Sequence, residues 1–486
     1  MSRRKKVLIV AGIVLGVAIL IPVIRHYQLR FAVASYIAEL KAKGEPMVLE
    51  QVIPPPVPPE KNGLPFITNA LANLTLKYGN VATSNPPPAM FMVAPGRAMV
   101  GWQQPDLRIS GRNTWEDLGR DLAAVKSDLD SFQNLTNHPI LDFNLDYQKG
   151  NELQLPHLAS LKRSVQWLSA SALYDLHQGN PQNACADICA MLDIVKGETD
   201  ERPTISQLVR SAIVSMAASP TWEILQDPDV TDDDLAQLQQ DWQSLEFVEP
   251  LEQATMFERV NQLQEFADAR KSSEKFNQLW GYFYAPDAPS YKKNNDTFPS
   301  QIRRSLFLRK WDELRWRWFW SYQDELRSLQ AFQGLKPNQN SPDSLRNFFS
   351  QSFFNGLAAA KRKAVAIEIA QNVVITAIAL KRYELRHHQL PATLEGLTPD
   401  LLKDVPIDCM DGQPLRYRPN ADGTFLLYSV SENGKDDGGD PSLPKNIQGS
   451  NFYWQNYRAL DWVWPQPATA AEIQKYYEEQ GKKSGN

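Results

Sequence analysis

The chain has few of the residues that build disulfide-bonded or enzymatic sites. It contains three cysteines, Cys185, Cys189 and Cys409, in 486 residues. An odd and small number of cysteines excludes a disulfide scaffold and leaves the compartment open. The motifs His-Glu-x-x-His and Gly-x-Ser-x-Gly and a phosphate-binding glycine loop are absent. Sequence motifs therefore identify no catalytic residue.

Excess positive charge is also lacking. The formal net charge of −5 argues against a general nucleic-acid binder. A hydrophobic content of 43% and a charged content of 22% are typical of a globular chain. The chain is longer than one hydrophobic core usually accommodates, so we expect about two or three domains.

Histidine and cysteine give little evidence of a metal site. Cys185 and Cys189 share one helix face, but no further pair is placed to complete four ligands. We therefore interpret them as small buried apolar residues. The pair His387-His388 is interpreted as a solvated helix end. The other histidines are His26, His138, His157 and His177.

The first 24 residues have the pattern of a membrane anchor. The basic cluster Arg3–Lys6 precedes Val7–Ile24, which carries no charge and as a helix would be about 27 Å long. The alternative is a cleaved signal peptide. Arg25 follows the apolar run at once and no small-x-small site lies just beyond it, which favours an uncleaved anchor. The basic cluster predicts a cytoplasmic N-terminus.

Residues 25–61 are expected to form a helical stalk, Tyr27–Ala42, and a Pro-rich linker around Pro54–Pro59. Residues 62–275 are predicted to be a domain of stacked helices. Apolar residues at helical spacing define one helix that starts near Leu158, and Gly179 followed by Pro181 separates it from the next. A third helix is expected to end before Pro220, and Thr231 is expected to cap a fourth. The stretch Ala172–Asn180, with Ala184 and Ala186 after it, resembles one tetratricopeptide-type hairpin.

Residues 276–300 are expected to be a linker, and residues 301–357 a Trp-rich helical segment. An apolar stripe there comprises Phe307, Trp311, Leu314, Trp318, Tyr322, Leu326 and Leu329. Trp316 and Trp320 lie off the stripe, among arginines. Such a helix could lie on a membrane surface or bind a partner. We favour the alternative of an interior helix with arginines that reach the solvent.

Residues 358–445 are predicted to form a helix followed by a small β-module. Apolar residues recur at helical spacing between Ile367 and Leu380, and Pro391 ends the helix. The segments Leu415–Arg418 and Thr424–Ser429 read as strands of a hairpin. An isolated hairpin is only marginally stable, so we expect it to cover the preceding helix.

The turn Ser431–Asp440 concentrates four acidic residues among three glycines. Oxygen ligands on a flexible loop suit calcium, although the spacing is not that of an EF-hand. The alternative is a solvated acidic turn. On spacing alone, both interpretations stay open.

The region 371–440 resembles the globular part of the major pseudopilin, the G protein of type II secretion systems. The shared motifs are Leu390-Pro391, Leu394, Leu397, Pro406-x-Asp408, Gly412-x-Pro414-Leu415-x-Tyr417, Leu427-Tyr428-Ser429 and Gly434–Gly439. The resemblance implies a long helix on a small antiparallel sheet, with a structural calcium ion in the loop after the strands. The ligands it implies are Ser431, Asn433, Asp436, Asp437 and Asp440. Pseudopilins carry this module directly behind a processed leader, whereas this chain carries it near the C-terminus.

Residues 446–486 form an aromatic tail that we expect to pack on the β-module, with Thr469 and Glu472 as a capping box. The fold class is therefore predicted to be α+β: an N-terminal transmembrane helix, a large helical domain and a small antiparallel β-module. We expect a single-pass inner-membrane protein, extracytoplasmic in bulk, that serves as a scaffold for envelope proteins in secretion- or pilus-type machinery and does not bind nucleic acid. The alternative is an envelope enzyme or substrate-binding receptor with a cleft in the helical domain, which convergent polar residues with shifted pKa values would favour.

Overall fold

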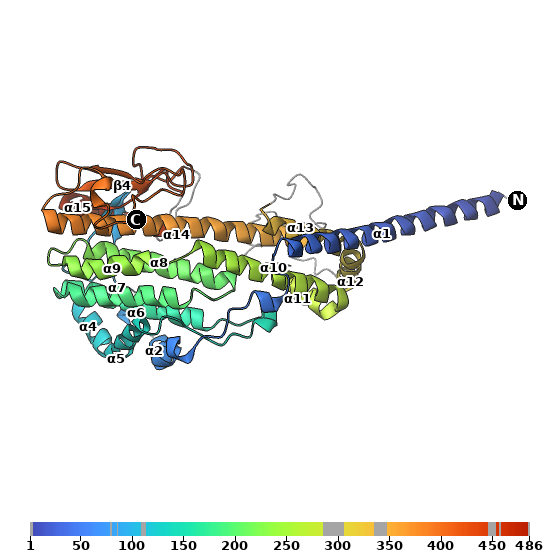
Figure 1. The fold of residues 1–486 in the computed structure, drawn as a ribbon, viewed down its shortest axis with the longest axis horizontal. Coiled ribbons are helices and arrows are strands. Elements are labelled where there is room, and N and C mark those ends of the chain that lie inside the picture. The colour runs from blue at the N-terminus through green and yellow to red at the C-terminus, as the bar shows by residue number, and fades with distance from the viewer. Residues whose placement is uncertain are drawn as a thin grey trace.

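The protein is an elongated helical body from which one long helix emerges, with small β-sheets at the far end (Figure 1). The computed structural model describes residues 3–77, 80–84, 86–107, 113–284, 306–334, 348–445, 453–455 and 458–484. The described part is mainly helical with two three-stranded sheets, which agrees with the predicted α+β class.

Helix α1 (Arg3–Ala42) contains 40 residues and is about 60 Å long. Ten large apolar side chains of its N-terminal part are exposed, from Ile9 to Ile24, and this part projects from the body (Figure 1). The helix is long and apolar enough to cross a membrane, as an anchor or a signal sequence would be. The predicted helical extension Tyr27–Ala42 is confirmed because α1 continues through it.

The segment after α1 returns along the body through two short 3-10 turns, η1 (Leu49–Gln51) and η2 (Pro59–Lys61). Val52 is buried against Phe257 and Val260. Its carbonyl accepts a hydrogen bond from Arg202 Nε at 3.0 Å. The Pro-rich linker therefore begins at a point that is fixed to the body.

The body is built from helices stacked side by side. They are α2 (Leu64–Leu76), α3 (Val81–Ser84), α4 (Trp115–Ala123), α5 (Lys126–Asp130), α6 (His157–His177), α7 (Pro181–Gly197), α8 (Thr204–Ile224), α9 (Asp232–Gln243), α10 (Val248–Lys271) and α11 (Ser273–Tyr284). The 3-10 segments η3 (Ser131–Thr136) and η4 (Tyr147–Glu152) lie between α5 and α6. Trp167, Trp222 and Trp242 are fully buried among these helices.

The predicted helix boundaries are mostly confirmed. Gly179 has a positive φ of 73°, which suits glycine, and α7 begins at Pro181. Thr231 and Asp234 form a capping box at the start of α9. The predicted end before Pro220 is wrong, because α8 continues through it to Ile224. Pro220 lies only four residues before the end of α8, so few helical hydrogen bonds are affected. The final turn stays helical because Trp222 and Ile224 pack into the core.

The expected linker 276–300 begins as a helix, because α11 extends to Tyr284. Residues 285–300 lie outside the described residues. The Trp-rich segment consists of α12 (Leu306–Arg315), a π-helical turn η5 (Trp316–Trp320) and α13 (Ser321–Phe332).

The prediction that this segment is an interior helix is right for α13 and wrong for the exposed side chains of α12 and η5. Leu329 is 1% exposed, but Trp311, Leu314 and Trp318 are 54%, 49% and 59% exposed. Trp316, which lies off the predicted stripe, is buried instead. A π-helical turn adds a residue to the helical repeat and so rotates the buried face, which explains the change. The side chain of Phe307 lies outside the described residues.

Helix α14 (Phe348–His387) also passes the length and composition test for a membrane helix, but 78% of its apolar window is buried. It is therefore a core helix, and it packs against α8, α9, α10 and α13. The turn η6 (Leu394–Leu397) follows it. The predicted hairpin is confirmed as β3 (Arg416–Pro419) and β4 (Phe425–Ser429), paired antiparallel, with Leu427 buried in the same core as α14.

The aromatic tail packs on the β-module, as predicted, and it also packs on α8. Strand β5 (Trp462–Val463) pairs with β4, and Trp454 of the turn η7 (Tyr453–Gln455) makes an edge-to-face contact with Trp462. Trp454 Nε1 donates to Ser219 Oγ at 3.0 Å. Phe452 and Tyr457 lie outside the described residues.

The second sheet ties the end of the tail to the body. Strands β1 (Phe91–Ala94) and β2 (Arg97–Met99) form a hairpin, and β6 (Gln466–Pro467) adds to β2 in parallel. The predicted capping box of Thr469 and Glu472 is confirmed at the start of α15 (Ala470–Ser484). The proposed division of the chain into domains stays a prediction.

Candidate functional site

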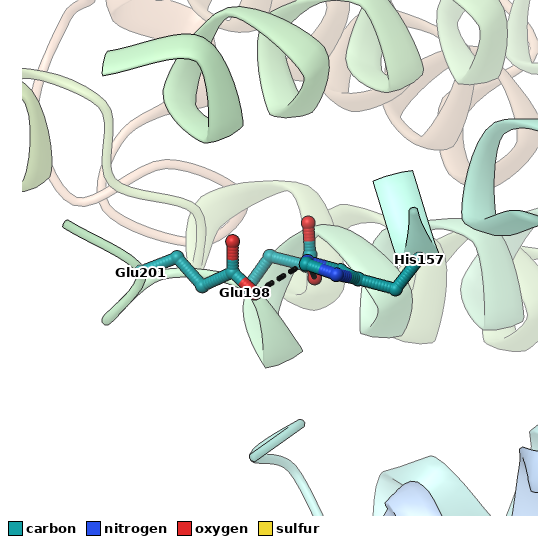
Figure 2. Close-up of side chains that lie close together, drawn as sticks. All are labelled: His157, Glu198 and Glu201. Atoms are coloured by element: carbon teal, nitrogen blue, oxygen red, sulfur yellow. Dashed lines mark ion pairs between the residues drawn. The ribbon is translucent and has the colours of Figure 1, made fainter. Parts of the chain in front are cut away.

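Three buried ionisable side chains meet where α6 begins and α7 ends. His157 is the first residue of α6, Glu198 follows the last residue of α7, and Glu201 lies in the loop before α8. Their exposed fractions are 8%, 0% and 5%. Figure 2 shows the two carboxylates directed at the imidazole ring. We call this set the His-Glu-Glu cluster.

The distances within the cluster are short. His157 Nε2 lies 2.7 Å from Glu201 Oε1 and 3.9 Å from Glu198 Oε1. One ligand atom from each residue lies within 4.8 Å of the other two. Two ligand atoms of a tetrahedral zinc ion stand about 3.4 Å apart. A small shift of side chains would therefore allow all three residues to bind one ion.

The loop that carries the two glutamates is fixed by a buried arginine. Arg210 of α8 donates from Nε to Val195 O at 2.9 Å and from Nη2 to Thr199 Oγ1 at 3.0 Å. Gln207 Nε2 donates to Glu201 O at 2.6 Å. On the other side, the His157 ring stacks on Phe143 with a centroid distance of 4.0 Å. The surrounding structure thus holds the three side chains in place without using their polar atoms.

The close polar contacts of the cluster are the ion pairs of His157 with Glu201 and Glu198. All four carboxylate oxygens of Glu198 and Glu201 are buried, and none accepts a hydrogen bond from another described residue. Burying a carboxylate without donors is costly unless it takes up a proton or binds a cation. Burial, and then the charge of Glu201, raise the pKa of Glu198 well above its ordinary value, and Arg210 opposes this.

The cluster touches a cavity. His157 lines a space of about 630 Å³ together with Phe143, Asp146, Lys149 and Glu152. Burial, and then the nearby charge of Glu201, raise the pKa of Tyr147 in the adjacent turn η4. The cavity therefore reaches the side chain of His157 at the edge of the cluster.

A second cavity, with a mainly apolar wall and a few polar groups, adjoins the same loop. It has a volume of about 510 Å³, and its wall includes Thr204, Glu258, Asn261 and Glu265. Thr204 N donates to Glu258 Oε1 at 3.0 Å. Burial raises the pKa of Glu265 to about 7. Convergent polar groups with shifted pKa values thus occur in the helical region.

The structure places the predicted calcium ligands on a loop with its own internal hydrogen bonds. Asn433 Nδ2 donates to Asp437 Oδ2 at 2.8 Å. Asp436 accepts from Gly438 N at 3.0 Å and from Tyr428 OH at 2.8 Å. These bonds, with the backbone bond first, lower the pKa of Asp436.

The other two predicted calcium ligands are Asp440 and Ser431. Asp440 accepts from Ser442 N at 2.9 Å, and Ser431 is buried with a φ of 59°. In the described part of the chain, the one group of three or more His, Cys, Asp or Glu ligands is the His-Glu-Glu cluster. Asp436, Asp437 and Asp440 are not brought together in that way, and the calcium site stays a prediction.

A tail residue that sequence reasoning did not identify holds the acidic loop. Asp461 is fully buried and accepts from Gly439 N at 2.7 Å, Asp440 N at 3.2 Å and Asp437 N at 3.4 Å. Burial raises its pKa, although these three bonds oppose the shift. The carboxylate of Asp461 therefore occupies the inner side of the loop.

Sequence reasoning named His157 among the histidines but did not identify Glu198 or Glu201. His157 is far from Glu198 and Glu201 in the sequence, and only the packing of α6 on α7 brings it to the two glutamates. The cysteines are free: Cys185 is buried, Cys189 is half-buried and Cys409 is exposed. Comparison with protein-family models, curated proteins and solved structures finds no match to this chain.

Proposed function

We propose that this protein is a membrane-anchored scaffold of the cell envelope whose helical body is fixed by a divalent metal ion at the His-Glu-Glu cluster. The observation that carries the metal proposal is the set of four buried carboxylate oxygens without donors around one imidazole. A cation at this point would compensate both carboxylates. It would also tie the loop between α7 and α8 to the start of α6.

The donor set indicates which metals fit. One imidazole nitrogen and two carboxylates suit zinc, iron(II) or manganese. Calcium prefers six to eight oxygen ligands and rarely takes histidine. The metal proposed here is therefore different from the calcium ion predicted for the acidic loop, and the two sites can be tested separately.

The envelope location rests on α1. An exposed apolar helix after a basic cluster supports an anchor with its short N-terminus in the cytoplasm and the body outside. The link to secretion- or pilus-type machinery rests on the C-terminal module. Its support is that β3, β4 and β5 form an antiparallel sheet on α14, which is the arrangement that the pseudopilin resemblance implies.

The experiment that tests the metal proposal is equilibrium dialysis of the purified full chain against zinc, followed by elemental analysis. We expect about one tightly bound ion per chain in the wild type. We expect its loss in Glu198→Gln/Glu201→Gln and its retention in Asp200→Asn, a matched change at a 56% exposed carboxylate of the same loop. Equal zinc content in all three proteins would reject the site.

A second candidate function is a metal-dependent hydrolase. The cavity beside His157 favours it, because three protein ligands leave a coordination position that water can take. Substitution with cobalt(II) distinguishes the two roles. A visible spectrum that titrates near neutral pH indicates a bound water and favours the hydrolase. A spectrum that does not change with pH indicates a closed, structural site.

A further inference from the structure

The end of the body from which α1 emerges carries a group of exposed apolar side chains. Trp311, Leu314, Trp318 and Phe319 are between 41% and 59% exposed. They belong to α12 and η5, and Figure 1 shows α12 at the end of the body beside α1. We call these four residues the aromatic surface.

The aromatic surface is fixed to α1 close to the end of its uncharged run. His26 Nδ1 lies 2.8 Å from Trp318 O, and the rings of His26 and Trp318 are 5.6 Å apart. Arg25 Nη2 donates to Gln323 Oε1 at 3.0 Å. The uncharged run of α1 ends at Ile24. Trp318 therefore lies at the level where a helix that crosses a bilayer leaves the hydrocarbon core.

Helix α1 also exposes aromatic side chains next to His26, its contact with Trp318. Tyr27 is 62% exposed and Phe31 is 75% exposed, both just beyond the uncharged run. Tryptophan and tyrosine are enriched at membrane interfaces, because their rings have an apolar body and a polar edge. These exposed aromatic side chains lie on a membrane helix as well as on the body. A protein partner that covered them would have to bind α1 at the membrane surface, whereas a lipid surface meets both parts at once.

The charges around the aromatic surface fit anionic lipid headgroups. Lys310 and Arg315 lie on α12 beside Trp311 and Leu314, and Arg25 and Arg30 lie on α1. The Arg315 guanidinium lies over the Trp320 ring at 4.7 Å from its centroid. Cationic residues near a membrane surface are attracted by anionic lipids.

We propose that the aromatic surface lies in the headgroup region of the bilayer that α1 crosses, so that the body has a fixed orientation at the membrane. The proposal rests on the membrane anchor of the proposed function, but it is independent of the metal site. It makes Trp311 and Trp318 contact residues for lipid. The proposed ligand is the surface of a phospholipid bilayer that contains anionic lipids.

The test uses the full chain in vesicles of phosphatidylcholine and phosphatidylglycerol. Cys189 and Cys409 are replaced by alanine, and a single nitroxide label is placed at Leu314→Cys or at Leu76→Cys. Leu76 is a matched control, because it is a leucine at the end of α2, is 68% exposed, and lies on a helix distant from the projecting part of α1 (Figure 1). Collision with oxygen, which partitions into lipid, is compared with collision with a water-soluble nickel chelate.

We expect the oxygen-to-nickel collision ratio to be several-fold higher at position 314 than at position 76. We expect Trp311→Ser/Trp318→Ser to lower the ratio at 314 toward that at 76. Equal ratios at 314 and 76, in protein that resists extraction at alkaline pH, would overturn the proposal while α1 remains an anchor. Release of the protein at alkaline pH would reject the anchor and this proposal together.

Discussion

Replacing Glu198 by glutamine should separate the effect of a metal from the effect of a buried ion pair. Burial, and then the charge of Glu201, raise the pKa of Glu198 well above its ordinary value, which favours the neutral carboxyl group when no metal is bound. Glutamine has nearly the same shape and is also neutral. With a chelator present, we expect the free energies of unfolding of wild type and Glu198→Gln to agree within about 1 kcal/mol at pH 7.

With metal present, the two proteins should differ. At a free metal concentration of 100 times Kd, binding to the folded state alone stabilises the wild type by about 2.7 kcal/mol. Loss of one ligand should weaken binding by at least about 100-fold, which leaves about 0.4 kcal/mol in the variant. The difference of about 2.3 kcal/mol corresponds to about 2 °C in Tm, because an unfolding entropy of about 2.1 cal/mol/K per residue gives about 1 °C per kcal/mol for a chain of 486 residues.

The assay is thermal unfolding of the full chain in detergent, with zinc and with chelator, and with Asp200→Asn as the control for changes in the same loop. We expect a zinc-dependent rise in Tm for the wild type and the control, and little rise for Glu198→Gln. The reasoning is refuted if the variant keeps the full rise. It is also refuted if the variant is several kcal/mol less stable in chelator, because Glu198 would then be an essential ionised partner of His157.

Three further predictions follow from other buried or acidic groups. Burial raises the pKa of Glu223 from 4.5 to about 8, so the stability that its protonated carboxyl group contributes is complete below pH 4.5 and is lost as the pH rises through 8. In urea unfolding, the wild type should therefore lose stability relative to Glu223→Gln across this range, by at most about 1.4 kcal/mol per pH unit. Parallel pH profiles of the two proteins would contradict this. Asp461→Asn should make the backbone amide of Gly439 exchange with solvent about tenfold faster, because this amide donates to the Asp461 carboxylate and a neutral side-chain amide accepts a weaker hydrogen bond. Unchanged exchange would show that the loop does not depend on Asp461. Calcium should raise the Tm of the wild type and not of Asp436→Ala/Asp437→Ala, and an absence of any calcium effect would identify the acidic turn as a solvated loop.

Much of the helical fold could be predicted because local chemistry decides it. The boundary between α6 and α7 depends on a glycine with positive φ and a proline at the first helical position. The start of α9 depends on a capping box within four residues. The hairpin of β3 and β4 depends on a short turn between alternating residues. Each of these signals is contained in a few neighbouring residues.

The errors arise where tertiary packing overrides the local signal. Helix α8 continues through Pro220 because Trp222 and Ile224 are buried beyond it. The π-helical turn η5 changes which tryptophans face the core, and a regular repeat cannot predict such a change. Local pattern reasoning therefore located the Trp-rich segment but assigned the wrong face to its first half.

The candidate site could not be predicted because its members come from distant parts of the chain. His157 and Glu198 are joined only by the packing of α6 against α7, and neither residue has a neighbouring motif. The acidic loop was predicted as a metal site because its charges are adjacent in the sequence. In the folded chain Asp436 accepts a hydrogen bond within its own loop, and the backbone of that loop donates to Asp461. The glutamates near His157 accept no hydrogen bond from the described residues.

The central claim is that one metal ion binds between His157, Glu198 and Glu201. Anomalous diffraction at the zinc absorption edge, from crystals of the full chain grown with zinc, tests this most directly. The account predicts one strong anomalous peak about 2.0–2.2 Å from His157 Nε2 and from one oxygen of each glutamate. An ordered cluster without a peak, with His157 and Glu201 still in contact, would contradict the account and identify the cluster as a buried ion pair.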